Sequence, residues 1–240
     1  MAQDDLPSRV LLKVSGEALM GNQGFGIDGA TVDRIARDVS EAHRMGVEIG
    51  LVVGGGNIFR GVRVAAKGGD RVTGDHMGML ATAINALSMR NALQKTGVPV
   101  VVMSAIAMPE IVETFSQREA LRHLSRGRVV IFAGGTGNPY FTTDSAAALR
   151  AAEIGANLLL KGTQVDGIYT ADPKLDPKAE RFEKLTHDEV LSLGLKVMDV
   201  TAIALARENE IPVAVFSIHE AGGFAAVLRG QGRATYVADA

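Results

Sequence analysis

Three short apolar runs of the chain lead directly into clusters of glycine, and charged residues accompany each cluster. The first run gives LLKVSGEAL with Lys13, the second LVVGGGNIFRG with Arg60, and the third VVIFAGGTGNPYFTTD with Asp144. Glycine lets backbone N–H groups converge on a ligand without side-chain clashes, and the N-terminus of a following helix favours an anion. One such cluster is weak support for a phosphate site, but three at one end of a sheet predict phosphate binding.

The familiar phosphate-binding motifs are absent from this sequence. No Gly-Lys dipeptide occurs, which excludes a G-x-x-x-x-G-K-[ST] loop, and no G-x-G-x-x-G fingerprint follows the first apolar run. The H-E-x-x-H spacing of a zinc site and the G-x-S-x-G of a serine hydrolase are missing as well. Any phosphate must therefore be neutralised by cations placed differently, and the candidates are Lys13, Arg60 and Lys161.

Each candidate residue also has an interpretation without chemistry. Lys13 could snorkel from the end of a strand, and Arg60 could lie on an exposed turn. Asp144 and Asp75 could each do no more than cap a helix. Tyr169, in the loop KGTQVDGIYTADP, could belong to an ordinary turn or lie along an adenine ring. The residues alone leave these alternatives open, although a lysine inside an apolar strand favours a role in phosphoryl transfer.

The apolar runs are nearly continuous, as expected of strands in a parallel sheet that is covered on both faces. The expected strands are RVLLKV from Arg9, EIGLVV from Glu48, VPVVVM from Val98, RVVIFA from Arg128, NLLLK from Asn157 and VAVFS from Val213. Helical stripes with capping and stop signals lie between the strands. The helical signals are Val32 to Val39 before Gly46, Met77 to Leu87 before Gly97, Ser116 with Glu119, Asp144 to Ile154 before Gly155, and Thr186 with Glu189. Repeated β-α units predict an α/β fold with helices on both sides of a mostly parallel sheet, in a single domain over residues 1–240.

The composition sets the broad class of the protein. Apolar residues make up 47% of the 240, and the formal net charge of −2 gives no basic field for nucleic acid. The absence of cysteine excludes disulfides and thiolate zinc sites and suits a reducing compartment. No apolar run approaches the roughly 18 residues of a membrane span, and the polar, acidic start is unlike a signal peptide. We therefore expect a soluble cytoplasmic protein.

Taken together, the motifs resemble the amino acid kinase superfamily and, within it, the bacterial uridylate kinase family. GDHMGMLAT and GTGNPYFTTDSAA are the segments specific to uridylate kinases, and we find no departure from the family pattern at a site position. The matching segments run in order from Lys13 to Asp199, so the resemblance covers nearly the whole chain: KVSGEAL, GFGID, GGGNIFRG, GDHMGMLAT, MSAI, GTGNPYFTTDSAA, VDGIYTADP and KVMD.

The resemblance implies a fold, a reaction and its regulation. The fold would be a three-layer α/β/α sandwich, the amino acid kinase fold. The reaction would be the reversible transfer of a phosphoryl group from ATP to UMP, with Mg²⁺ but no dedicated protein metal site, in pyrimidine nucleotide biosynthesis. The protein would be a cytoplasmic homohexamer, activated by GTP and inhibited by UTP. Its N-terminal part would mainly bind UMP, and residues from about 160 would mainly bind the nucleoside of ATP.

The resemblance also assigns roles to residues at matching motif positions. The catalytic set would be Lys13, Arg60, Asp144 and Lys161. ATP would contact Lys13, Val14, Ser15, Gly16, Gly56, Arg60, Thr163, Tyr169 and Asp172. UMP would contact Gly55, Asp75, Thr136, Gly137, Asn138, Pro139, Tyr140, Phe141, Thr142 and Thr143. The loop tied to activation by GTP would comprise Gly21, Asn22, Gln23, Gly24, Phe25 and Gly26.

The acceptor oxygen in such a reaction belongs to a phosphate whose second pKa is about 6, so no general base is needed. Asp144 would then orient Lys13, Lys161 or the metal. Two other functions remain as alternatives. One is a kinase of the same superfamily that acts on a carboxylate or carbamate, and the GTGNPYFTTD loop argues against it. The other is a protein that binds nucleotides or oxyanions without turnover, and the joint presence of Lys13, Arg60 and Asp144 argues against that.

Overall fold

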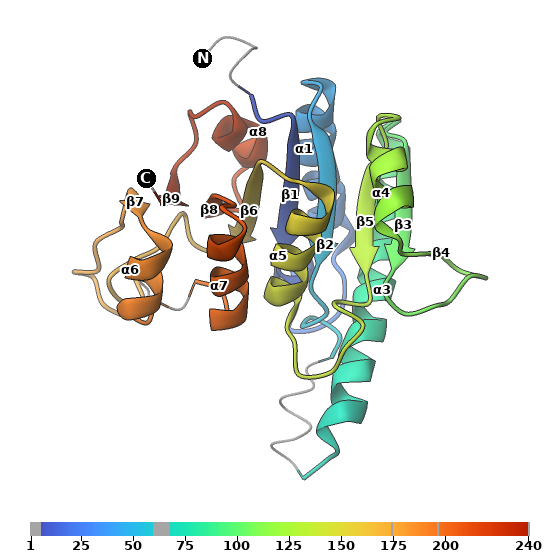
Figure 1. Ribbon diagram of the computed structural model, residues 1–240, viewed down its shortest axis with the longest axis horizontal. Coiled ribbons are helices and arrows are strands. Elements are labelled where there is room, and N and C mark those ends of the chain that lie inside the picture. The colour runs from blue at the N-terminus through green and yellow to red at the C-terminus, as the bar shows by residue number, and fades with distance from the viewer. Residues whose placement is uncertain (1–5, 60–67, 174, 196, 240) are drawn as a thin grey trace.

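The computed structural model describes residues 6–59, 68–173, 175–195 and 197–239. Arg60 lies outside these residues. The described strands form one nine-stranded sheet whose order is β4-β3-β5-β2-β1-β6-β8-β9-β7 (Figure 1). Their bounds are β1 Arg9–Val14, β2 Glu48–Val53, β3 Val100–Ser104, β4 Glu113–Thr114, β5 Val129–Ala133, β6 Leu158–Thr163, β7 Lys184–Leu185, β8 Val213–Ser217 and β9 Ala234–Val237.

Pairing from β4 through β8 is parallel, and the sheet turns antiparallel between β8 and β9. The short strand β7 pairs in parallel with β9 at the edge. β1 lies in the middle of the sheet, with β2 on one side and β6 on the other. In open α/β sheets, ligands bind beyond the carboxyl ends of the strands at such a reversal of strand order, so the fold directs attention to the end of β1.

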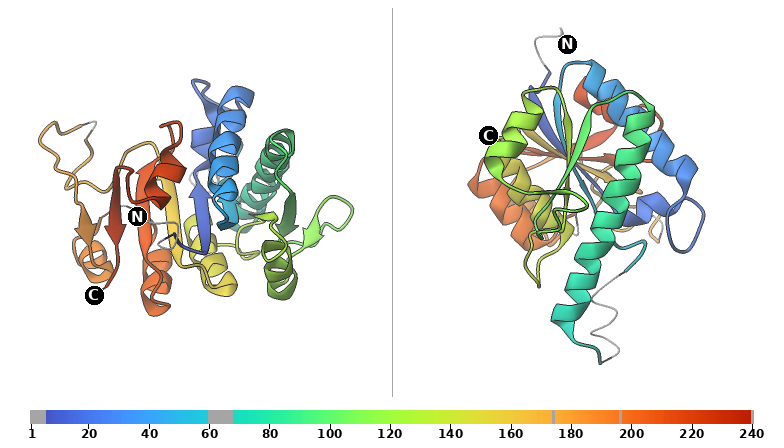
Figure 2. Two further views of the ribbon diagram at one scale, coloured as in Figure 1. Left: turned by 90° about the horizontal axis from the view of Figure 1, so that it is seen from above. Right: turned by 90° about the vertical axis from the view of Figure 1, so that its right-hand side faces the viewer.

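Helices cover both faces of the sheet and make three layers (Figure 2, left). The helices α1 (Gly29–Arg44), α3 (Arg71–Lys95) and α8 (Gly223–Leu228) pack on one face. The other face carries α4 (Gln117–Leu124), α5 (Thr143–Ile154), α6 (His187–Ser192) and α7 (Val200–Glu208). A short 3₁₀ helix, η2 (Gly16–Met20), follows β1. The expected fold, a three-layer α/β/α sandwich around a mostly parallel sheet, is therefore confirmed.

The pleat of β1 decides where its lysine points. Val10, Leu12 and Val14 belong to the core with α1, whereas Leu11 belongs to the core with α5. Side chains alternate between the two faces of a strand, so Lys13 shares the α5 face with Leu11. The same alternation places Lys161 of β6 on the α5 face, since Leu159 lies in that core.

All six expected strands and the main helices are present, with boundaries that shift by one or two residues in several strands. Thr186 and Glu189 do form a reciprocal capping box, and Gly155 ends α5 in the left-handed conformation. The structure decides against the interpretation in which Asp75 and Asp144 only cap their helices. Asp70 caps α3, so Asp75 lies one turn inside that helix, and Thr142 caps α5, so Asp144 lies in its first turn. The carboxylates of Asp75 and Asp144 are thereby free for other partners.

Candidate active site

An ion-pair triad forms at the carboxyl ends of β1 and β6. Lys13 and Lys161 are direct partners in the register of the two parallel strands. The carboxylate of Asp144, from the first turn of α5, lies between them, with Oδ1 2.7 Å from Lys13 Nζ and Oδ2 2.8 Å from Lys161 Nζ. Lys161 Nζ also donates to the carbonyl oxygen of Val197. Lys13 therefore meets Asp144 and Lys161, which lie far from it in the sequence, at the point that the topology singles out.

Burial and mutual attraction oppose each other in this triad. Burial by itself would raise the pKa of the Asp144 carboxyl, but the ammonium groups of Lys13 and Lys161 outweigh it and hold the pKa below its ordinary 3.8. Burial lowers the pKa of Lys161 below its ordinary 10.5, although the Asp144 carboxylate opposes this shift. Asp144 is thus a carboxylate at neutral pH, and the triad sets two lysines against one carboxylate, a composition that suits phosphate.

The start of α5 is fixed by a residue to which the sequence assigned no role. Asp199, the N-cap of α7, accepts hydrogen bonds from the hydroxyls of Thr142 and Ser145. Its Oδ1 also accepts from the backbone N–H of Ala202 at 2.9 Å. These contacts hold the first turn of α5 and therefore the Asp144 carboxylate. An aspartate before a helix is common, so only its place in the KVMD motif could have drawn attention to it.

The loops that follow β1 and β2 touch through their backbones. A Cβ on Gly16 would come within 2.6 Å of the Gly54 carbonyl oxygen and 2.7 Å of the Gly56 nitrogen. A Cβ on Gly54 would lie 2.8 Å from the Gly16 nitrogen, and one on Gly55 would lie 2.7 Å from the carbonyl oxygen of Gly78 in α3. Only glycine permits so close an approach of backbones. The expected ATP positions Val14 and Ser15 lie at the end of β1 and at the N-cap of η2, beside these glycines.

The loop from 134 to 143 lies over the N-terminal half of α3. Oδ2 of Asp75 accepts a hydrogen bond of 2.8 Å from the backbone N–H of Tyr140 and is paired with the Arg71 guanidinium. Tyr140 has φ 72°, in the left-handed region that residues with a side chain rarely adopt, and its ring is largely exposed. Strain of this kind concentrates at ligand-binding loops. The Arg71 guanidinium lies 5.6 Å from the centre of the Tyr140 ring.

The remaining residues of this loop surround that contact. Thr136 accepts from the N–H of Asn138 at 3.1 Å and so forms a local turn. Phe141 is half exposed, and Gly137 has φ 81°. The hydroxyl of Thr143 lies beside Gly54, 3.3 Å from the position that a Cβ there would take. The loop from 134 to 143, which is expected to hold UMP, thus reaches the glycine loop after β2 at this point.

The loop after β6 is the expected contact for the nucleoside of ATP. The Thr163 hydroxyl accepts from the N–H of Val165 at 2.9 Å. The Tyr169 hydroxyl donates to Asp166 Oδ1 at 2.5 Å, and this hydrogen bond raises the pKa of Tyr169 above its ordinary 10.0. Asp172 lies further along, in an exposed turn where its carbonyl oxygen accepts from the N–H of Leu175. Thr163 ends β6 two residues after Lys161, which connects this loop directly to the triad.

The loop at residues 21–26, expected to respond to GTP, is exposed but tied to the glycine loop at one end. The N–H of Gly26 donates to the carbonyl oxygen of Asn57, and the Asn57 side chain donates back to the carbonyl oxygen of Gly26, both at 2.9 Å. Phe25 is two-thirds exposed, and Gly21 has φ 56°.

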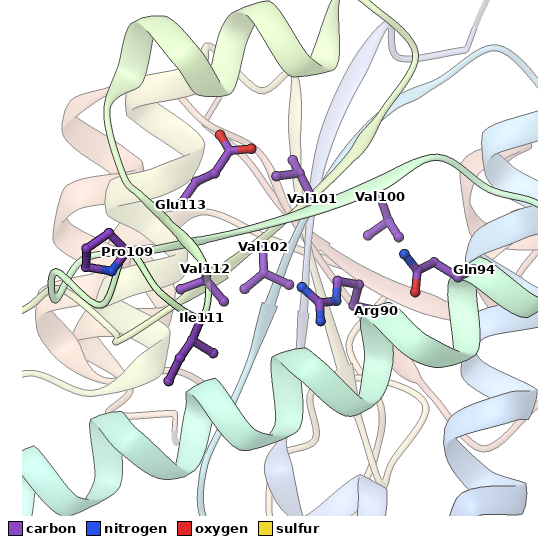
Figure 3. Close-up of a pocket in the computed structure, with 9 residues that line it drawn as sticks. All are labelled: Arg90, Gln94, Val100, Val101, Val102, Pro109, Ile111, Val112 and Glu113. Atoms are coloured by element: carbon purple, nitrogen blue, oxygen red, sulfur yellow. The ribbon is translucent and has the colours of Figure 1, made fainter.

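A cavity of about 280 Å³ lies apart from the triad, between α3 and the β3–β4 edge of the sheet (Figure 3). Arg90 and Gln94 of α3 line it together with the β3 residues Val100 to Val102. Its lining includes no residue of the triad or of the glycine loops. The candidate active site is therefore the cluster at the carboxyl ends of β1 and β6, and not this cavity. Within the part of the chain that the structure describes, no group of three His, Cys, Asp or Glu residues could hold a metal ion. Among the same residues, no helix has the length and apolar character needed to cross a membrane.

Comparison with known proteins agrees with this fold. A model of the amino acid kinase family matches residues 8–217. The match covers most of the chain, and the chain therefore belongs to the amino acid kinase family.

Relatives narrow this assignment to one branch of the family. The uridylate kinase of Agrobacterium fabrum is 71% identical over 239 residues, which cover 100% of this chain and 99% of that protein. The uridylate kinase of Rhizobium meliloti is also 71% identical, and the match covers 100% of both. The crystal structure of UMP kinase from Ureaplasma parvum is 39% identical, with a TM-score of 0.91 and coverage of 96% of this chain and 98% of that one. The UMP kinase of Bacillus anthracis is 37% identical, with a TM-score of 0.93 and coverage of 98% and 97%. Within its family, the chain belongs with the uridylate kinases.

Proposed function

We propose that this protein transfers the γ-phosphoryl group of ATP to the phosphate of UMP, giving ADP and UDP. The observation that carries the proposal is the triad of Lys13, Asp144 and Lys161 at the reversal of strand order, beside two glycine loops in backbone contact. Its relatives bear the names uridylate kinase and UMP kinase. The proposed pathway context is pyrimidine nucleotide biosynthesis.

The main obstacle to this reaction is the repulsion between two nucleotide anions. Lys13 and Lys161 would offset it, and backbone N–H groups of the glycine loops would add partial positive charge. Asp144 fixes the separation and direction of the two ammonium groups, so that they need no reorganisation when the phosphoryl group moves. Positioning and electrostatic stabilisation dominate phosphoryl transfer, and this arrangement supplies both. Arg60, on the GGGNIFRG segment, would add a further cation from outside the described residues.

No proton needs to be removed from the acceptor. The phosphate of UMP is mostly dianionic at neutral pH because its second pKa is about 6. Asp144 is moreover poorly suited to act as a base, since its pKa is lowered and both of its oxygens face ammonium groups. We therefore assign Asp144 to orientation of the lysines and not to proton transfer.

The fit of magnesium to the described residues is poor. Each carboxylate oxygen of Asp144 is paired with a lysine. Among the residues that the structure describes, no three metal-ligating side chains form a cluster. Mg²⁺ commonly reaches phosphoryl-transfer sites on substrate phosphates. We treat it as part of the substrate MgATP, and no step here depends on a protein ligand to it.

UMP would lie over the N-terminal half of α3, against the loop from 136 to 143. Tyr140 and Phe141 present exposed rings there, and Asp75 holds the loop through the Tyr140 N–H. ATP would extend from the triad toward Thr163, Tyr169 and Asp172 on the opposite side of β1. The two nucleotides would meet at Gly54 to Gly56, which contact both Gly16 and the Thr143 hydroxyl.

The proposed assembly is a homohexamer in the cytoplasm, activated by GTP and inhibited by UTP, with one domain per chain. These features rest on the resemblance. One observation supports self-association: Met77, Leu80 and Ile84 lie on one exposed face of α3 and are 43%, 52% and 50% exposed. An apolar stripe of this kind is typical of an interface between subunits.

An assay of ADP release separates the proposal from its alternatives. The purified chain is incubated with MgATP and, in turn, with UMP, CMP, AMP, GMP, aspartate, glutamate and carbamate, with and without GTP. We expect ADP release with UMP well above that with every other acceptor. Turnover with a carboxylate or carbamate but not with UMP would establish the other kinase class. Binding of ATP without turnover on any acceptor would establish a non-catalytic protein.

A further inference from the structure

Two buried asparagines join the glycine loop after β2 to helix α3. Asn57 and Asn85 are 1% and 0% exposed, and their side-chain amides pair reciprocally. Asn57 Nδ2 donates to Asn85 Oδ1 at 3.0 Å, and Asn85 Nδ2 donates to Asn57 Oδ1 at 2.6 Å. A buried amide is costly unless its hydrogen bonds are made, so this pair needs an explanation.

The second N–H of each amide points to a loop of the site. Asn85 Nδ2 donates to the carbonyl oxygen of Gly54 at 2.6 Å, and Asn57 Nδ2 donates to that of Gly26 at 2.9 Å. All four N–H donors are therefore used. Turning either amide over would set carbonyl oxygen against carbonyl oxygen, so the hydrogen-bond pattern is fixed by the surroundings. The Asn85 amide donates to the carbonyl oxygen of Gly54 and to the side-chain amide of Asn57, and neither of these groups titrates.

The same helix also holds the acceptor loop. The Thr82 hydroxyl accepts from the N–H of Gly134 at 2.8 Å, and Asp75 accepts from that of Tyr140 at 2.8 Å. One face of α3 thus contacts the loop after β2 through Asn85 and the loop after β5 through Thr82 and Asp75. The helix begins well beyond the strand ends and runs back along the sheet (Figure 2, right).

We propose that Asn85 and Asn57 are positioning residues, which fix the glycine loop relative to α3 and tie the loop at residues 21–26 to it. This inference rests on the proposed function for its kinetic consequences. The carbonyl of Gly54 sets the path of the loop against Gly16, where a Cβ would clash at 2.6 Å. A small shift of Gly54 therefore displaces both phosphate-binding segments. Because Asn57 contacts Gly26 through its backbone and its side chain, a change at residues 21–26 is transmitted to the same loop.

The variant Asn85→Asp tests this proposal, because it keeps the shape of the side chain and removes both donors. At pH 8, we expect kcat for UDP formation to fall roughly ten- to hundredfold, since small misplacement of reacting groups has effects of this size. Burial raises the pKa of a carboxyl, and protonation restores one O–H donor. The ratio of variant to wild-type kcat should therefore rise as pH falls from 8 to 6. Asn85→Leu, which has no donor at any pH, should show no such recovery.

Asn91→Asp is the matched control, because Asn91 lies exposed on the same helix. We expect it to behave as the wild type at every pH. Unchanged kcat in Asn85→Asp, or an equal and pH-independent loss in Asn85→Asp and Asn85→Leu, would overturn the positioning role and leave a purely structural pair. If Asn85→Asp fails to fold, Asn57→Asp gives the same test from the loop side.

Amide hydrogen exchange keeps this inference separate from the proposed reaction. In Asn85→Asp at pH 8, we expect faster exchange than in the wild type in peptides covering residues 21–28 and 54–59, with β5 unchanged. If the wild type forms no UDP but the two loops loosen together, the reaction assignment fails and the positioning inference stands. If the wild type forms UDP and exchange in both loops is unaltered, the positioning inference fails.

Discussion

Lys13 and Lys161 are direct register partners on adjacent parallel strands, and the carboxylate of Asp144 lies between their ammonium groups. Two like charges on neighbouring strands would repel each other without this third group. The arrangement therefore requires Asp144 for its geometry, which explains a buried carboxylate without assigning it a proton-transfer role.

Asp144→Asn should lower kcat for UDP formation by roughly a hundredfold, because the lysines lose the group that orients them. The acid side of the pH–rate profile should keep its shape in the variant, since it follows the second pKa of the acceptor phosphate, about 6. Initial rates from pH 5 to 9 check this. Asp144 would act as a base if the acid limb of the wild-type profile vanished in the variant.

The same change should affect stability in a pH-dependent way. The folded-state pKa of Asp144 is lowered from 3.8, so its carboxylate stabilises the folded protein above that pH, and this contribution is lost as pH falls through the lowered value. At pH 7, Asp144→Asn removes the carboxylate that pairs with Lys13 and Lys161 and should cost about 3 kcal/mol of unfolding free energy. Urea denaturation at pH 7, 5, 4 and 3 should show the two proteins converging toward the acid end. A difference that stays constant over this range would contradict the assigned pairing.

The sequence was sufficient to predict the sheet but not its edge. Strands such as β2 and β5 are continuous apolar runs that need no partner to be identified. β9 consists of ATYV, and β7 of two residues that pair only with β9, so neither carries a periodic signal of its own. Their direction, antiparallel to β8, depends on contacts that only the folded chain supplies.

The candidate site was predictable where a residue type conflicted with its surroundings. Lys13 stood out because a charge interrupts an apolar strand, and the structure shows where the charge is compensated. The sequence leaves Asp75 open as a helix cap, but Asp70 caps α3 and Asp75 binds a distant loop. The only sign of Asn85 in the sequence is an amide between apolar neighbours in ATAINALSM. Its role depends on Gly54, 31 residues away in the sequence, and no local pattern encodes that contact.

Asp75→Asn should affect the acceptor and not the donor. The variant loses a charged acceptor for the Tyr140 N–H and the partner of Arg71, so the loop at 136–143 should be held less firmly. We expect the KM for UMP to rise about tenfold, the kinetic equivalent of one charge-assisted hydrogen bond, with the KM for ATP unchanged. Steady-state kinetics with each substrate varied in turn would measure both. Equal changes in the two KM values would show that Asp75 supports the whole site instead.

Ile84→Glu should dissociate the proposed assembly. A charge at the end of the stripe formed by Met77, Leu80 and Ile84 cannot be buried between subunits without a partner. Sedimentation velocity should show a smaller species than the wild type. Leu193→Glu, at another exposed apolar residue, the C-cap of α6, is the control and should not change the sedimentation coefficient. A wild type that already sediments as a monomer would contradict the assembly itself.

The transfer of a labelled γ-phosphoryl group tests the central claim most directly. The wild-type chain is incubated with UMP and ATP labelled at the γ-phosphate, and the nucleotides are separated. We predict that label appears in UDP in equal amount to the ADP formed, that Lys13→Met lowers this rate roughly a thousandfold, and that Lys95→Met, at an exposed lysine of α3, leaves it unchanged. Label released as inorganic phosphate, or UDP formation that survives Lys13→Met, would contradict the account.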